Sequence, residues 1–253
     1  MKNKNDELKN EFFLQKLEFF FKRYIIILVL VGIIGISLRF YFLDFDIPVH
    51  SDSFEYFRIA NDLALGEEIE SSMIVKGWPT FLSIFFSFYE SSNFLDYHTL
   101  QRILSAIISV ITIFPCYLLC RVFFDKRISI ISSSFFIFEP HIIQNSILGL
   151  SEPLFILIGT ISLALFFQNK SRYTIISFIL LASFVYVRSE GIALFGICSI
   201  IFFVRNGIKK NQIITYLISL SLFLAVLFVL MSIKKDDFFM RPFHFQEYIF
   251  WNY

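Results

Sequence analysis

The sequence predicts an all-α protein: a polytopic bundle of about seven transmembrane helices, with a long outer loop after the first. Three observations support this fold class. Of the 253 residues, 57% are hydrophobic and only 17% charged, whereas average soluble domains are near half apolar and a quarter charged. The mean hydropathy is +0.69. The apolar residues also form blocks: YIIILVLVGIIGISL and ITYLISLSLFLAVLFVL contain no charged residue and approach the roughly 20 residues that cross a hydrocarbon core.

Seven apolar stretches are predicted to span the membrane. They cover about 24–42, 103–122, 128–147, 148–167, 173–187, 191–204 and 213–233. The first is predicted to be a retained span, because it follows a polar, charged segment and lacks a small-x-small cleavage site. Residues 1–23 are expected to be a cytoplasmic amphipathic segment on the membrane surface. Residues 234–253 are expected to be an aromatic tail on the outer side.

The distribution of lysine and arginine predicts the orientation. Residues 1–23 and the joints 121–127, 168–172 and 205–212 together contain 14 of the 22 basic residues, all on one side if the path alternates. By the positive-inside rule this side is cytoplasmic, which predicts a multi-pass protein of the cell membrane with a cytoplasmic N-terminus. Between Asp44 and Asp96, in contrast, ten carboxylates accompany two basic residues.

This acidic stretch is the outer loop, residues 43–102. Within it, FEYFRIANDLAL has apolar residues near helical spacing, and GWPTFLSIFFSFY is apolar and aromatic. Both segments are predicted to be short helices lying on, or dipping into, the outer membrane surface.

A length argument singles out Arg188 and Glu190. Residues 173–204 form an apolar block of 32 residues that is interrupted only by RSEG. Basic flanks predict that both ends are cytoplasmic, so the block is a hairpin, but two full crossings need about 40 residues. The turn is therefore expected at membrane depth, where charges are costly unless they face a polar cavity or each other. The alternative is that Arg188 and Glu190 only pair with each other.

Two further clusters are candidates for chemistry. Asp52 and Glu55 follow the first span with Tyr56, and a carboxylate there can act as a general base; alternatively Asp52 is a helix N-cap. Glu139, His141 and Glu152 are expected near the outer ends of two spans, where they could bind a divalent cation. Their spacing matches no closed metal motif, and Glu152 is alternatively a cap for the helix beginning at Pro153.

Arginine on the acidic side suggests an anionic ligand. Arg102 lies at the outer end of its span and Arg188 in the buried turn, and guanidinium groups can hold a lipid phosphate bidentately. For Arg102 the alternative is interfacial snorkelling.

Taken together, these segments resemble the polyprenyl-phosphate-sugar-dependent GT-C glycosyltransferases, of the protein O-mannosyltransferase and aminoarabinose transferase type. HSDSFEY resembles the first-loop signature, GWPTFLSIF the amphipathic segment after it, and YVRSEGIAL an Arg-x-Glu-Gly stretch. The resemblance covers about residues 20–210. Since such relatives have more spans, and often a soluble outer domain, it implies a truncated member.

The resemblance implies a role for each candidate. Asp52 takes the place of the catalytic aspartate; many relatives have Asp-Glu where this chain has Asp52-Ser53, and Glu55 is a possible substitute. Arg102 and Arg188 fall where the family contacts the donor phosphate, beside Tyr56 and Glu190 as further substrate-binding residues. Glu152 matches an acidic residue after the third span.

The expected function is therefore transfer of a sugar from a polyprenyl phosphate to a protein, lipid or glycan acceptor on the outer face. The expected partners are this donor, the acceptor and membrane lipids, without nucleic acid, and the one candidate cofactor is a divalent cation. Two alternatives are a small polytopic transporter or lipid-handling protein, in which Arg188 and Glu190 line a solute path, and a non-catalytic membrane subunit.

Overall fold

A computed structural model of the chain describes residues 24–44, 49, 51–67, 77–168 and 170–232. These residues form helices and connections without any strand, which confirms the all-α fold class. The helices are Tyr24–Phe42, α2 (Asp52–Leu65), α3 (Gly77–Phe86), α4 (Phe94–Ile111), α5 (Ile113–Phe123), α6 (Lys126–Ile137), α7 (Pro140–Ile147), α8 (Glu152–Phe166), α9 (Ser171–Val187), α10 (Gly191–Asn206) and α11 (Lys210–Met231). The predicted N-terminal surface segment and aromatic tail lie outside the described residues.

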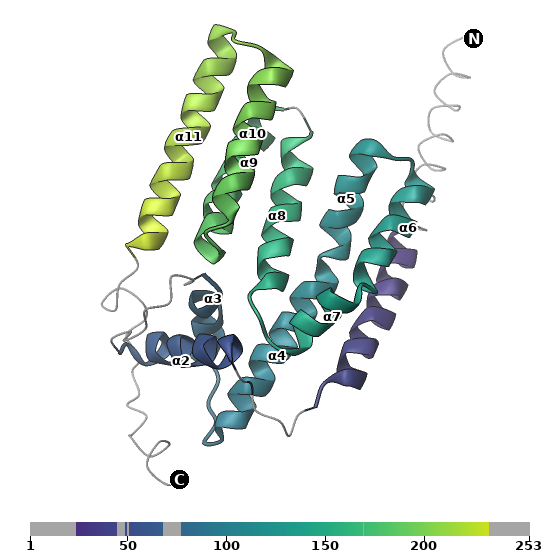
Figure 1. Ribbon diagram of the computed structural model, residues 1–253, viewed down its shortest axis with the longest axis vertical. Helices are drawn as coiled ribbons and strands as arrows, with labels where there is room; N and C mark the ends of the chain where they lie inside the picture. The colour runs from purple at the N-terminus through teal and green to yellow at the C-terminus, as the bar shows by residue number, and fades with distance from the viewer. Residues whose placement is uncertain (1–23, 45–48, 50, 68–76, 169, 233–253) are drawn as a thin grey trace, which may run out of the picture.

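The connections gather at two ends of the bundle (Figure 1). We call one the loop end, where α2 and α3, the α7–α8 connection and the α9–α10 turn lie. We call the other the basic end, where the α5–α6, α8–α9 and α10–α11 connections lie. These three connections coincide with the basic joints of the sequence. The helices from α5 onward therefore run back and forth between an end rich in basic residues and an end formed by the acidic first loop.

Three helical segments are long and apolar enough to cross a membrane: Tyr24–Phe42, Phe94–Phe123, which joins α4 to α5, and Lys210–Met231. The helices α8, α9 and α10 have 15, 17 and 16 residues. At about 1.5 Å per residue none exceeds about 26 Å, which is less than the roughly 30 Å of a hydrocarbon core. Three of the seven predicted spans thus have full length in the structure, and the others are shorter.

The predicted span 128–147 needs correction, because the structure divides it into α6 and α7. Pro140 has no backbone N–H and cannot continue α6. The Glu139 carboxylate accepts the Ile142 backbone N–H at 2.8 Å and so begins α7 instead. The predicted span 103–122 is also different: its helix already begins at Phe94, where the Asn93 side chain caps it, and it is interrupted at Thr112.

A buried arginine of the first long helix donates hydrogen bonds to the end of α6, where the helix breaks. Arg39 is fully buried. Its guanidinium donates to the backbone carbonyl of Ile137, which ends α6, at 3.3 Å. It also donates to Ser109 Oγ at 2.8 Å and Ser146 Oγ at 3.1 Å. The positive charge thus lies at the negative end of the α6 dipole, and one side chain connects the Tyr24–Phe42 helix to α4, α6 and α7.

Two short helices in the first loop confirm the two helical segments predicted there. The helix α2 ends with Gly66 in the left-handed conformation (φ 76°), which glycine adopts without strain. Both helices pack on α4 and α8 through a cluster that includes Tyr56, Phe57, Trp78, Leu82 and Leu154. This packing places the first loop beside the α7–α8 connection and the α9–α10 turn.

Candidate functional site at the loop end

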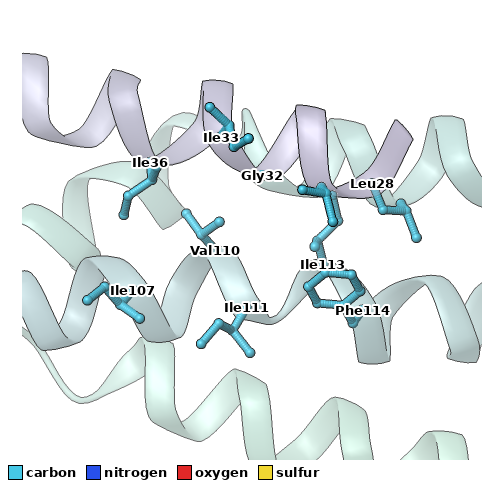
Figure 2. A pocket seen from close by; sticks show the side chains of 10 residues that line it. Leu28, Gly32, Ile33, Ile36, Ile107, Val110, Ile111, Ile113 and Phe114 are labelled. Atoms are coloured by element: carbon cyan, nitrogen blue, oxygen red, sulfur yellow. The ribbon is translucent and has the colours of Figure 1, made fainter. Parts of the chain in front are cut away.

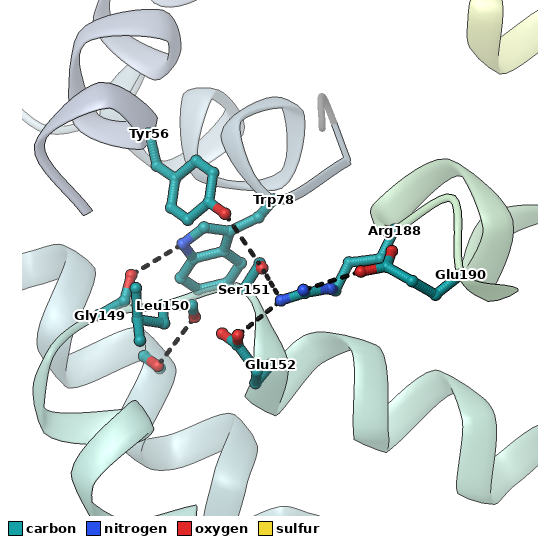
Figure 3. A network of polar contacts seen from close by, with 9 residues as sticks. Tyr56, Trp78, Gly149, Leu150, Ser151, Glu152, Arg188 and Glu190 are labelled. Carbon is teal, nitrogen blue, oxygen red and sulfur yellow. Dashed lines mark hydrogen bonds and ion pairs between the residues drawn. The ribbon is translucent and has the colours of Figure 1, made fainter. Parts of the chain in front are cut away.

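The connection between α7 and α8 is fixed by the first loop and by α4. Its Gly149 has a φ of 72°, a conformation that favours glycine. The Gly149 carbonyl accepts two hydrogen bonds, from Trp78 Nε1 at 3.0 Å and from Gln101 Nε2 at 2.8 Å. Gln101 Nε2 also donates to the Ser53 carbonyl at 3.0 Å. Residues from α2, α3 and α4 therefore converge on one turn, which leads directly into Ser151. Figure 3 shows the contact of Trp78 with Gly149.

Arg188 lies in the α9–α10 turn and points at this connection (Figure 3). Its Nη1 donates to Glu152 Oε1 at 2.5 Å, and its Nη2 donates to Glu190 Oε1 at 3.0 Å. Nη1 is also 3.5 Å from Ser151 Oγ, which lies 3.4 Å from the Tyr56 hydroxyl. The turn of the hairpin is thus connected to the first loop through Arg188, Ser151 and Tyr56.

The structure contains the hairpin predicted for this block; its depth in a membrane stays a prediction. The helix α9 ends at Val187 and α10 begins at Gly191, so residues 171–206 do not form one continuous helix. The α9 end touches the first loop directly: the Thr80 and Tyr186 hydroxyls are 2.9 Å apart. A Cβ on Gly77 would lie 2.5 Å from Val187 Cα, so this contact requires glycine.

Burial and neighbouring charges shift the pKa values of Arg188, Glu190 and Tyr56. Burial alone lowers the pKa of the Arg188 guanidinium, but the hydrogen bonds and charges of Glu190 and Glu152 outweigh it and leave the pKa raised. The hydrogen bond from Arg188 lowers the pKa of Glu190. Burial raises the pKa of the Tyr56 phenol; the Ser151 hydrogen bond opposes this shift, and the charges of Glu152 and Asp52 add to it. Tyr56 is therefore a neutral hydroxyl at physiological pH, and Asp52 lies within electrostatic reach of it.

Two carboxylate groups at the site have unused acceptor capacity. Glu152 begins α8 without capping it, and its Oε2 is buried and accepts no hydrogen bond from the described residues. Asp52 is exposed as the first residue of α2. The N-cap of α2 is Ser51, and no side chain caps this helix. Neither Asp52 nor Glu152 makes a side-chain cap hydrogen bond, but both lie in the first turn of their helices, where a negative charge suits the dipole.

Glu55, the second predicted acid, is engaged elsewhere. Its two carboxylate oxygens accept from Arg58 Nη2 at 2.8 Å and Arg58 Nε at 3.2 Å. Arg58 also lies 3.5 Å from Asp62. A carboxylate held by a guanidinium is a weaker base than a free one, so the structure favours Asp52 over Glu55 as a general base.

The two predicted donor-binding arginines have different partners. Arg102 is buried and donates to the Asp44 carbonyl at 2.6 Å, just beyond the Tyr24–Phe42 helix. Arg188 binds Glu152, Glu190 and Ser151.

The three residues predicted to bind a divalent cation do not come together in the structure. Glu139 caps α7, His141 is exposed on α7, and Glu152 binds Arg188. Within the described residues, no group of three or more His, Cys, Asp and Glu side chains is placed to hold a metal ion. Cation binding stays a prediction from the sequence.

Sequence reasoning missed the residues that position the site. Ser151 bridges Tyr56 and Arg188, while Gln101 and Trp78 hold Gly149. A signal for Ser151 was present, because a serine before Glu-Pro is typical of a helix start. No sequence signal identifies Gln101, since its partners lie about fifty residues away on either side.

A separate groove runs between the Tyr24–Phe42 helix and α4–α5 (Figure 2). It has a volume of about 240 Å³ and is lined by apolar residues, among them Leu28, Ile36, Val110 and Phe114. Without polar lining groups it offers nothing for catalysis.

The fold and the site define a helical protein with three candidate membrane spans and a charged cluster where its first loop meets a helical hairpin. Comparisons of the chain with known protein families, with curated proteins and with solved structures find no match.

Proposed function

We propose that this chain is a multi-pass membrane glycosyltransferase that uses a polyprenyl-phosphate sugar as donor. The observation that carries the proposal is the cluster of Tyr56, Ser151, Glu152 and Arg188 at the loop end, with Asp52 one helical turn before Tyr56 on α2. The sequence resemblance to GT-C enzymes supports it, because the matching motifs contain Asp52 and Arg188. About seven crossings, a cytoplasmic N-terminus and a location in the cell membrane are parts of the same proposal.

In this mechanism Asp52 accepts the proton of the acceptor hydroxyl while the hydroxyl oxygen attacks the anomeric carbon. The bond from that carbon to the phosphate oxygen breaks, and the anomeric configuration inverts. Negative charge develops on the departing polyprenyl phosphate, which Arg188 stabilises. The short helices α8 to α10 support a site below the membrane surface, where a lipid-linked sugar is within reach of the first loop.

The charge of the site sets one condition on this mechanism. Arg188 faces two carboxylates, Glu152 and Glu190, so it does not by itself attract a phosphate. The Glu190 side chain is 61% exposed, and its ion pair is therefore easily exchanged with water or ligand. The donor phosphate is expected to replace Glu190 on Arg188, while Glu152 keeps the guanidinium in place.

The test is Asp52→Asn, assayed with a polyprenyl-phosphate sugar and the purified protein in lipid. Transfer is expected to fall by about 10²-fold or more, because general-base catalysis typically contributes this much. The unfolding temperature is expected to change little, since Asp52 is exposed and makes no described hydrogen bond.

Glu55→Gln is the matched control in the same helix. It removes one charge from α2 but leaves the proposed base, so most of the transfer rate is expected to remain. Normal turnover in Asp52→Asn contradicts the mechanism and favours the transporter or subunit alternatives.

A further inference from the structure

A polar cavity lies at the basic end, on the side of the bundle away from Arg188. It has a volume of about 160 Å³ and is formed by the first turns of α9 and α11 and the last turn of α10. Its lining residues are Lys170, Ser171, Thr174, Phe202, Asn206, Gln212 and Thr215. Since a water molecule occupies about 30 Å³, the space fits a group of roughly five non-hydrogen atoms.

The helices that form this cavity contain several basic residues and few carboxylates. Lys170 and Lys209 lie in the two connections that flank it, and Arg172, Arg205 and Lys210 lie in the adjoining helix ends. Between residues 153 and 235 the only carboxylate is Glu190, which lies in the α9–α10 turn at the loop end. Lys170 is the one charged residue in the described lining, and a cationic group in a polar cavity of basic surroundings predicts an anionic ligand.

The helix ends at the cavity add to this imbalance. Lysines occupy the N-cap positions of α9 and α11, and neither helix has a side-chain cap among the described residues. A cation at a helix N-terminus is unfavourable, because the dipole is positive there. The chain makes an ordinary cap at the same end: the Asp125 carboxylate accepts the Ile128 N–H at the start of α6. The last turn of α10 contributes the opposite dipole, so the cavity lies beside two helix N-termini and one C-terminus.

Donors that suit a tetrahedral oxyanion line the cavity. Lys170 supplies an ammonium group, Ser171 a hydroxyl and Gln212 an amide, whereas the Thr215 hydroxyl already donates to the Asn211 carbonyl. Several charge-assisted hydrogen bonds to one small anion are the usual basis of phosphate recognition.

We propose that this cavity is a binding site for a phosphate group, and that it is independent of the transferase site proposed at the loop end. The cavity lies at the N-terminal end of α11, one of the three candidate spans. This position corresponds to headgroup level if α11 crosses the membrane. Two sources share the required chemistry: an anionic phospholipid headgroup and free phosphate.

The test compares purified protein in detergent with added phosphatidylglycerol, phosphatidylcholine or inorganic phosphate. The readouts are the unfolding temperature and the number of lipids retained in native mass spectrometry. Phosphatidylglycerol is expected to raise the unfolding temperature and to be retained, whereas phosphatidylcholine is not. Stabilisation by phosphate alone identifies a free anion as the ligand. Equal effects of both lipids together with no effect of phosphate overturn the proposal.

Lys170→Asp separates binding from folding. Aspartate is a better N-cap than lysine and suits the helix dipole, so the unfolding temperature without ligand is expected to stay the same or to rise. The affinity for the anion is expected to fall at least about fivefold, because one basic contact at an anionic surface contributes about 1 kcal/mol.

The matched control is Lys126→Asp at the start of α6, which also lies at the basic end but does not line the cavity. It is expected to keep the full response to phosphatidylglycerol or phosphate. An equal loss of response in both variants indicates non-specific attraction to the basic end and overturns the proposal.

Discussion

At the scale of single residues, Arg39 shows how one buried side chain can hold several helices. It donates to Ser109, Ser146, the Gly35 carbonyl and the Ile137 carbonyl. In Arg39→Lys a single ammonium group replaces the planar fork and cannot reach all four acceptors. Each acceptor left without a donor costs about 1–3 kcal/mol. The free energy of unfolding, measured in mixed micelles, is therefore expected to fall by about 1–3 kcal/mol.

Arg127→Lys is the control, since Arg127 is exposed on α6. Its effect is expected to stay within about 0.5 kcal/mol, as for most surface substitutions. If both variants are equally stable, Arg39 does not hold the helices together.

At the scale of elements, the contact between α3 and the end of α9 determines whether the first loop lies at the hairpin turn. In Gly77→Ala the new Cβ meets backbone atoms of Val187 at 2.5 and 2.7 Å, so the helices must separate. Overpacking of this kind costs about 1–3 kcal/mol. Trp78, the next residue, is fully buried. We expect its fluorescence to shift to the red in a Trp251→Phe background, where Trp78 is the only tryptophan.

Gly196→Ala is the matched control in α10, because a Cβ there meets nothing within 4 Å. Alanine is favoured over glycine inside a helix by about 0.5–1 kcal/mol. This variant is expected to be as stable as the parent or more so, without a spectral shift. A Gly77→Ala protein that behaves like Gly196→Ala contradicts the close contact.

At the scale of the whole molecule, the two ends are expected to face opposite sides of a membrane. Ser92 and Gln168 are exposed residues at the loop end and the basic end. With Cys116, Cys120 and Cys198 replaced, Ser92→Cys is expected to react with a membrane-impermeant maleimide in intact cells. Gln168→Cys is expected to react only after permeabilisation, following the positive-inside rule. The reverse pattern inverts the proposed orientation, and labelling of both positions in intact cells contradicts the alternation.

The sequence by itself determined the helical class and the two short helices of the first loop, because periodicity and run length are local properties. Its seven predicted spans include the three long apolar helices, although one of them begins earlier, at Phe94. It also indicated the break at Arg188–Glu190, since 32 apolar residues are too few for two crossings. Only the tertiary structure decided which charges meet. It joined Arg188 to Glu152 and Glu55 to Arg58, and gave Arg102 a different partner. The physical reason is that a side-chain contact across the bundle depends on helix rotation and packing, to which residues far apart in the chain contribute together.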